Sequence, residues 1–189
     1  MKVSIGVSAR HIHINREDLD KLFGPGYELN KYKDLSQPGE FASMEKVTIK
    51  TEKGEITAVR ILGPVRSYTQ AEISKTDSYK LGINPPVRNS GDLKGSAIIK
   101  IIGPCGEIER ECCIIAKRHI HINSTDLKKY NLINNESVKV KIDSEKPTIL
   151  ENVYIKSKDN YVFEMHIDVD DANSSLTKQG DYGHIIKGD

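Results

Sequence analysis

The six-residue segment RHIHIN occurs twice in this chain, at residues 10–15 and again at 118–123. The two copies contain four of the chain's six histidines. Because a recurring sequence motif marks a repeated structural unit, the sequence predicts two related lobes of similar size, each a small closed β-barrel. A chain of 189 residues is long enough to bury two such small cores.

Short apolar alternations predict a mainly β protein. They lie at residues 46–51, 55–62, 96–103, 108–116, 138–142 and 152–156. Helical segments are brief, and they lie at residues 16–23, 75–82, 124–131 and 169–176. They are too short for ordinary crossovers between parallel strands, so we expect them to cap the barrels. Residues 82–96, GINPPVRNSGDLKGS, form the clearest connection.

The composition indicates a globular protein of the cytoplasm. A net charge of +1 gives no bulk attraction to nucleic acid or to an anionic membrane. No segment approaches the roughly 18 apolar residues of a membrane span, and MKVSIGVSAR lacks the apolar core of a signal peptide. Cys105, Cys112 and Cys113 match no common zinc spacing, so we expect reduced structural thiols, with metal ligation as the less favoured alternative.

A looser pattern occurs four times: a metal-capable residue, Ile, a helix-capping residue, two further residues and Asp. The copies are residues 13–18, 72–77, 121–126 and 166–171. The capping positions hold good helix N-caps, namely Asn15, Ser74, Asn123 and Asp168. The pattern predicts four strand-to-helix junctions, each with a ligand-capable residue at the end of its strand. Taken alone, the caps could simply reflect the folding of a duplicated unit, without any chemistry.

The two His-Ile-His words favour metal binding. Strand pleating sends both imidazoles of a word to one face, while the isoleucine points to the core. Catalytic zinc usually has three protein ligands and one open position, and Glu72 and His166 are the natural third ligands. If the His-Ile-His motif occurred only once, its histidines would be better interpreted as a hydrogen-bonded polar face of the strand. His184 matches no copy of the pattern and is expected at the surface.

Residues 61–74, ILGPVRSYTQAEIS, predict an anion site. Gly63-Pro64 is expected to form a turn, and Arg66 precedes three hydroxyl-bearing residues. The planar guanidinium of arginine can donate two parallel hydrogen bonds to phosphate or carboxylate. An ordinary surface arginine is an equally weighted alternative. The usual nucleotide-binding loops and the Gly-x-Ser-x-Gly nucleophile are missing, so metal and anion together indicate electrophilic activation of a substrate.

Several segments together resemble the phosphate propanoyltransferase family, the phosphotransacylases associated with bacterial microcompartments. They are VSARHIHINREDLDKLFGPGYELNKYKDLSQPGEFASMEKVTI, ILGPVRSYTQAEISKTD, RNSGDLKGS, AKRHIHIN and EMHIDVDDAN, in order from Val3 to about Ala172. The resemblance implies reversible acyl transfer, propanoyl or acetyl, between coenzyme A and inorganic phosphate. The implied fold is mainly β, with two small β-barrel domains capped by short α-helices.

The resemblance also implies the site residues. One zinc is assigned to His11, His13 and Glu72, and a second zinc to His119, His121 and His166. Arg66 is assigned to phosphate binding and catalysis, with direct attack of phosphate assisted by zinc. Coenzyme A is placed against Val7, Ser8, Ala9, Lys53, Arg60 and Asn173. Without the resemblance, Lys53 and Arg60 would be interpreted as solvated charges.

The implied lobes are residues 1–10 plus 118–189, with the second ligand set, and residues 11–117, with the first set and the phosphate site. The expected partners are acyl-CoA and phosphate, a second copy in a homodimer, and microcompartment shell or lumen proteins. The resemblance begins within three residues of Met1, and it does not include the N-terminal encapsulation segment that members of the family often carry. The expected location is therefore the cytoplasm or, if that segment was removed, the interior of a microcompartment.

Two other classes fit the same ligands. In a zinc-dependent thioester hydrolase, a zinc-bound water would attack the carbonyl and release free acid, with no role for phosphate. In a non-catalytic metal-stabilised binding module, four protein ligands would usually close a structural zinc site, which three-ligand sets do not. The presence of Arg66 favours acyl transfer to phosphate over hydrolysis.

Overall fold

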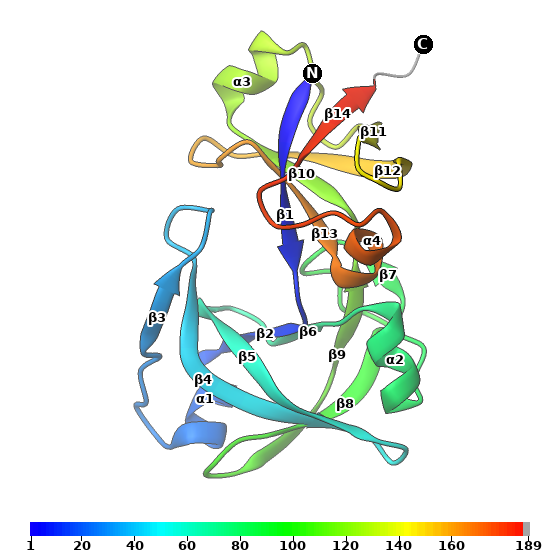
Figure 1. The fold of residues 1–189 in the computed structure, drawn as a ribbon. Helices are drawn as coiled ribbons and strands as arrows, with labels where there is room; N and C mark the ends of the chain where they lie inside the picture. Colours follow the sequence, from blue (N-terminus) through cyan, green and yellow to red (C-terminus); the bar gives the residue numbers. More distant parts are fainter. Residues whose placement is uncertain (187–189) are drawn as a thin grey trace. The chain divides into compact units, whose positions relative to one another are not determined.

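The computed structural model describes residues 1–186, which divide into two compact units (Figure 1). One unit combines Met1–Ala9 with the chain from Lys117 onward, and the other is Arg10–Ala116. Residues 187–189, which were expected in the first of these lobes, lie outside the described residues. Each unit contains a closed ring of six strands and two short helices, so the predicted mainly β class with two small barrels is confirmed.

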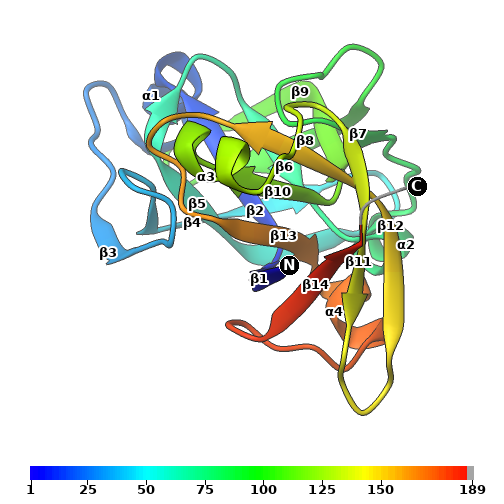
Figure 2. The same ribbon diagram turned by 90° about the horizontal axis from the view of Figure 1, so that it is seen from above.

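The first unit takes one barrel strand from the N-terminus. Its strands are β1 (Lys2–Ser8), β10 (His119–Ile122), β11 (Ser137–Ile142), β12 (Thr148–Ser157), β13 (Glu164–Asp168) and β14 (Tyr182–Ile186). The ring runs β1-β13-β10-β12-β11-β14, and β1 closes it by pairing with both β13 and β14, which lie beside it in Figure 2. Ile5 of β1 packs with Ile120 and Met165 in the barrel core, so the N-terminal strand is an integral part of this unit.

The second unit has eight strands, six of which form its barrel. They are β2 (His11–Asn15), β3 (Lys31–Asp34), β4 (Phe41–Lys50), β5 (Glu55–Arg66), β6 (Gln70–Glu72), β7 (Val87–Arg88), β8 (Ala97–Ile102) and β9 (Glu107–Ala116). Because β8 pairs with both β4 and β9, the order β4-β5-β2-β6-β9-β8 closes on itself. The predicted connection at residues 82–96 lies inside this unit and contains β7.

The four predicted strand-to-helix junctions are confirmed. The helices are α1 (Arg16–Phe23), α2 (Lys75–Leu81), α3 (Ser124–Lys129) and α4 (Val169–Ser174). Each predicted cap accepts a backbone N–H from the third helical residue, and the four caps are Asn15, Ser74, Asn123 and Asp168. Among residues 1–186, none of the helices has the length and apolar character needed to span a membrane.

The expected turn at Gly63-Pro64 is wrong. Strand β5 continues through both residues to Arg66. Its pairing with β2 shifts here, from His13 opposite Leu62 to Asn15 opposite Arg66, so β5 bulges instead of turning. Gly63 is required at this point because a Cβ would meet the Phe41 ring at 2.1 Å. The bulge places Arg66 beside the strand that carries the first His-Ile-His word.

Candidate metal and anion site

The first ligand set belongs to the second unit, where it lies on two antiparallel strands. In the pairing of β2 with β6, His11 lies opposite Glu72 and His13 lies opposite Gln70. Directly opposed side chains share a face of the sheet, so the four residues meet on one side. Ile12 points the other way and is fully buried in the barrel core, as the alternation of the word predicts.

The donor atoms of this set converge. His11 Nε2 lies 3.6 Å from Glu72 Oε2, and His13 Nε2 lies 3.9 Å from Glu72 Oε1. All three residues offer a ligand atom within 4.8 Å of the others. Donors around a tetrahedral zinc with bonds of about 2.0–2.1 Å stand about 3.3–3.4 Å apart. Small side-chain adjustments would therefore let His11, His13 and Glu72 hold one ion.

The histidines of this set are chemically suited to ligation. His11 and His13 are only 7% and 5% exposed. Burial lowers the pKa of His13 well below its usual value, and the nearby His11 and Arg66 charges add to the effect. A neutral imidazole keeps a nitrogen lone pair for a metal. Imidazole and carboxylate donors suit zinc, although other divalent ions also accept them.

The second ligand set repeats this arrangement on β10 and β13. His119 lies opposite His166, and His121 lies opposite Glu164. The ring centroids of the three histidines are separated by 4.7 Å (119–121), 5.2 Å (119–166) and 4.7 Å (121–166). The three imidazoles therefore gather on one face of the first unit.

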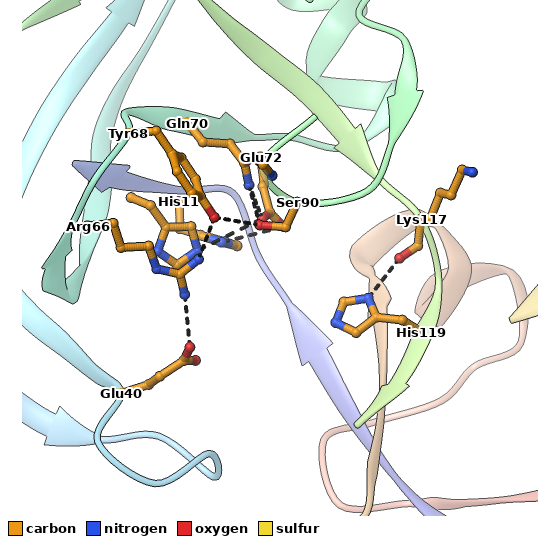
Figure 3. A network of polar contacts seen from close by, with 11 residues as sticks. His11, Glu40, Arg66, Tyr68, Gln70, Glu72, Ser90, Lys117 and His119 are labelled. Atoms are coloured by element: carbon orange, nitrogen blue, oxygen red, sulfur yellow. Dashed lines mark hydrogen bonds and ion pairs between the residues drawn. The ribbon is translucent and has the colours of Figure 1, made fainter. Parts of the chain in front are cut away.

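His119 is oriented by the backbone just before its strand. Its Nδ1 lies 2.8 Å from the Lys117 carbonyl oxygen, a contact drawn in Figure 3. Such a hydrogen bond selects the tautomer whose Nε2 carries the lone pair for a metal. Burial lowers the pKa of His119 well below its usual value, with the Lys156 charge adding to it. The His121 ring is held by stacking on Tyr161, 4.0 Å between centroids.

Arg66 is fixed by two partners (Figure 3). One terminal nitrogen donates to Glu40 Oε1 at 2.8 Å, and the other donates to the Tyr68 hydroxyl at 3.3 Å. Glu40 follows a tight turn, where its N–H donates to the Gln37 carbonyl and Gly39 has φ of +82°. The Arg66 side chain is 23% exposed, so the guanidinium is held in place yet remains accessible to an anion.

A chain of hydrogen bonds joins Arg66 to the Glu72 carboxylate. The Tyr68 hydroxyl lies 3.4 Å from Ser90 Oγ, which accepts from Gln70 Nε2 at 2.9 Å. The same Nε2 donates to Glu72 Oε1 at 2.6 Å. Gln70 is fully buried, and its Oε1 accepts the Gly91 N–H at 2.7 Å. The predicted anion and metal residues therefore belong to one network, visible in Figure 3.

Sequence reasoning missed three members of this network, and it assigned one hydroxyl wrongly. Gln70 could have been found, because it lies two residues before Glu72 on a strand and so shares its face. Glu40 and Ser90 lie in connections that carry no comparable local signal. Thr69, in the connection between β5 and β6, does not join this network: its hydroxyl donates to the buried Asp18 at 2.6 Å.

Four of the predicted coenzyme A residues lie in the first unit. Val7 and Ser8 occupy the end of β1, opposite Ile167 and Asp168 of β13. Ala9 follows directly, and it is exposed, as is Asn173 of α4. These residues cluster around the strand end that precedes α4, although the contact of each with coenzyme A stays a prediction.

The other two coenzyme A residues lie in different parts of the second unit. Arg60 is opposite His11 in the sheet, and its guanidinium stacks over the Tyr32 ring at 4.9 Å. Lys53 lies in the turn before β5, where a Cβ on Gly82 would meet its Cδ at 2.4 Å. Lys53 precedes Glu55, the first residue of β5, whereas Arg60 lies five residues further along that strand.

Comparison with known proteins shows the family of this chain. The family model for phosphate propanoyltransferase matches residues 4–178. A phosphate propanoyltransferase of Thermotoga maritima is 47% identical over 187 residues, covering 98% of this chain and 89% of the relative. One from Priestia megaterium is 51% identical over 182 residues, covering 96% and 84%. One from Clostridioides difficile is 45% identical over 186 residues, covering 98% and 89%.

These matches over nearly the whole chain identify an acyltransferase. The chain belongs to the phosphate propanoyltransferase family, as its sequence motifs predicted.

Proposed function

We propose that this enzyme transfers a propanoyl or acetyl group reversibly between coenzyme A and inorganic phosphate, with zinc at its two ligand sets. The observation that carries the proposal is the hydrogen-bond chain from Arg66 through Tyr68, Ser90 and Gln70 to Glu72. This chain connects the accessible Arg66 guanidinium to the Glu72 carboxylate, whose oxygens lie close to the nitrogens of His11 and His13. An anion and a metal would therefore be held in fixed relation to each other.

In the proposed reaction, Arg66 binds and orients phosphate. Glu40 and Tyr68 restrain the guanidinium, so that little of its freedom is lost when phosphate binds. A phosphate oxygen forms a bond to the thioester carbonyl carbon, the carbon–sulfur bond breaks, and coenzyme A leaves as the thiolate. Holding two reactants in this way can supply about 7–11 kcal/mol of a barrier.

The chain's other polar residues support this step. His11, His13 and Glu72 would hold one zinc, and His119, His121 and His166 a second. A bound zinc supplies a Lewis acid that stabilises negative charge on the carbonyl oxygen or on the thiolate. Gln70 keeps the Glu72 carboxylate in a single orientation through its 2.6 Å hydrogen bond. No protein nucleophile is needed.

The remaining elements of the proposal rest on the family resemblance. Val7, Ser8, Ala9, Lys53, Arg60 and Asn173 are proposed to contact coenzyme A. Assembly into a homodimer, contact with microcompartment shell or lumen proteins, and a location in the cytoplasm or inside a microcompartment are proposed on the same ground.

The test is phosphate-dependent release of coenzyme A thiol from propanoyl-CoA by metal-loaded and chelated protein, with acyl phosphate assayed in parallel. We expect release that requires both phosphate and metal and yields acyl phosphate. Thiol release without phosphate, with free acid as product, would instead identify a hydrolase. No release from any short acyl-CoA would leave only a metal-stabilised binding module.

A further inference from the structure

Glu40 is held by its backbone directly before strand β4. Its N–H donates to the Gln37 carbonyl oxygen at 3.1 Å, and its own carbonyl oxygen accepts the Leu35 N–H at 3.0 Å. Strand β4, which starts with the next residue, pairs with β5, the strand that ends at Arg66. Both backbone hydrogen-bonding groups are thus engaged, so the position of the Glu40 side chain next to Arg66 follows from the fold.

Only one oxygen of the Glu40 carboxylate is engaged in the described part of the chain. Oε1 accepts from Arg66 Nη2 at 2.8 Å (Figure 3), whereas Oε2 has no described partner among residues 1–186. The Glu40 side chain is 32% exposed. Because an ionised carboxylate only accepts hydrogen bonds, Oε2 is available to a ligand that carries a hydrogen.

Arg66 keeps hydrogen-bond donors for the same ligand. A guanidinium has about five N–H groups to donate, and among the described residues Glu40 and Tyr68 each accept one of them. The remaining N–H groups can donate to the oxygens of an anion. The site therefore presents cationic N–H donors and a carboxylate acceptor side by side.

This combination distinguishes tetrahedral anions by their protons. At neutral pH, inorganic phosphate and arsenate carry an O–H group, whereas sulfate carries none. Phosphate can accept hydrogen bonds from the Arg66 guanidinium and donate its own O–H to Glu40 Oε2. Sulfate would instead place a bare oxygen against the carboxylate, and two negative charges without a proton between them repel each other.

We propose that Glu40 determines the anion specificity of this site: it accepts the hydrogen of phosphate and disfavours anions that have none. The inference rests on the proposed function, in which Arg66 binds phosphate. The contact of Glu40 with Arg66 restrains the guanidinium for every anion alike, so restraint alone would not separate phosphate from sulfate. The preference between these two anions therefore reports the role proposed for Glu40.

The test compares the binding of inorganic phosphate, arsenate and sulfate to the zinc-loaded full chain, by isothermal titration calorimetry at neutral pH and without coenzyme A. Glu40→Gln keeps an amide oxygen that can accept from Arg66, but it replaces the second carboxylate oxygen by an N–H donor. Glu28→Gln is the matched control, because Glu28 also pairs with an arginine, Arg16, at 3.0 Å. Thermal unfolding checks that each variant is folded.

We expect the wild-type chain and Glu28→Gln to bind phosphate and arsenate about 10- to 100-fold more tightly than sulfate, the range that one hydrogen bond to a charged group supplies. In Glu40→Gln, the dissociation constants of phosphate and sulfate should become roughly equal, because the amide N–H donates to an oxygen of either anion.

Equal affinity of the wild-type chain for phosphate and sulfate would overturn the inference while leaving the anion site in place. A preference for phosphate that persists in Glu40→Gln would restrict Glu40 to orienting Arg66. Absence of phosphate binding, or phosphate binding that Arg66→Ala leaves unchanged, would overturn the anion role of Arg66 itself, and with it that part of the proposed function.

Discussion

Arg118 donates from Nε and Nη2 to the two carboxylate oxygens of Asp171, each at 2.7 Å. Arg10 makes the same fork with Asp77, at 2.8 and 2.7 Å. Each arginine begins a copy of RHIHIN, and each aspartate is the third helical residue after a cap. The hydrogen-bonded carboxylate raises the pKa of both arginines. The arginine of the repeated word is therefore structural: it anchors the histidine strand to a neighbouring helix.

Replacing Arg10 by Met should lower the free energy of unfolding by roughly 1–3 kcal/mol, because the Asp77 carboxylate would lose its counter-charge. The Asp77 side chain is 6% exposed, whereas Arg10 is 44% exposed, which keeps the loss below that of a fully buried pair. Urea unfolding of the chelated protein measures the change.

The control for this prediction is Lys21→Met, which removes the exposed ion pair of Lys21 with Glu17. Exposed pairs contribute about 0–1 kcal/mol. An Arg10→Met variant that differs from wild type by no more than Lys21→Met does would contradict the structural role of the fork.

Local patterns predicted the local features of this fold. The caps and the inward isoleucines follow from neighbouring residues, so Asn15, Ser74, Ile12 and Ile120 could be assigned from the sequence alone. Partners distant in the chain could not, because they depend on strand register. The pairing of Arg110 with the buried Asp18 at 2.6 Å is one such contact. Only the resemblance implied the N-terminal strand in the C-terminal barrel, since nothing in its apolar pattern distinguishes one barrel from the other.

In the candidate site too, residues marked by local sequence patterns could be predicted, whereas partners distant in the chain could not. The repeated motif marked the candidate ligands, and alternation along a strand could have extended the prediction to Gln70, two residues before Glu72. Ser90 and Glu40 reach the site from loops. Their positions result from the packing of whole connections, for which the local sequence has no periodic signal.

Replacing Arg66 by Ala should raise the KM for phosphate by roughly 10- to 100-fold, because hydrogen bonds to a charged group contribute about 1.5–3 kcal/mol. The KM for propanoyl-CoA should change little. Initial rates at varied phosphate concentration measure the effect. Arg16→Ala is the control, since Arg16, the first residue of α1, pairs with Asp20 and Glu28. Wild-type phosphate kinetics in Arg66→Ala would remove Arg66 from the mechanism.

The three thiols should differ sharply in reactivity. Burial raises the pKa of Cys112 to about 12, and it raises the pKa of Cys113 as well, whereas Cys105 is exposed. At about pH 8, below the ordinary thiol pKa, both buried sulfurs stay protonated and inaccessible. A disulfide reagent should therefore titrate one thiol in the native protein and all three in guanidinium chloride. Cys105→Ser should abolish the native reaction, and two fast native thiols would contradict the structural assignment of Cys112 and Cys113.

Replacing Gln70 by Leu should weaken zinc binding at the first site by about 10- to 100-fold, because the amide that orients Glu72 Oε1 is lost at nearly constant volume. Chelator competition measures the affinity. Gln179→Leu is the control: Gln179 accepts only the Val7 N–H among the hydrogen bonds described for it, in the other unit. Glu72→Gln identifies which ion is affected, since it removes the carboxylate itself. If Gln70 acts through Glu72, adding Gln70→Leu to Glu72→Gln should cost far less than Gln70→Leu costs alone. Fully additive losses would instead mean that Gln70 stabilises the site independently of that carboxylate.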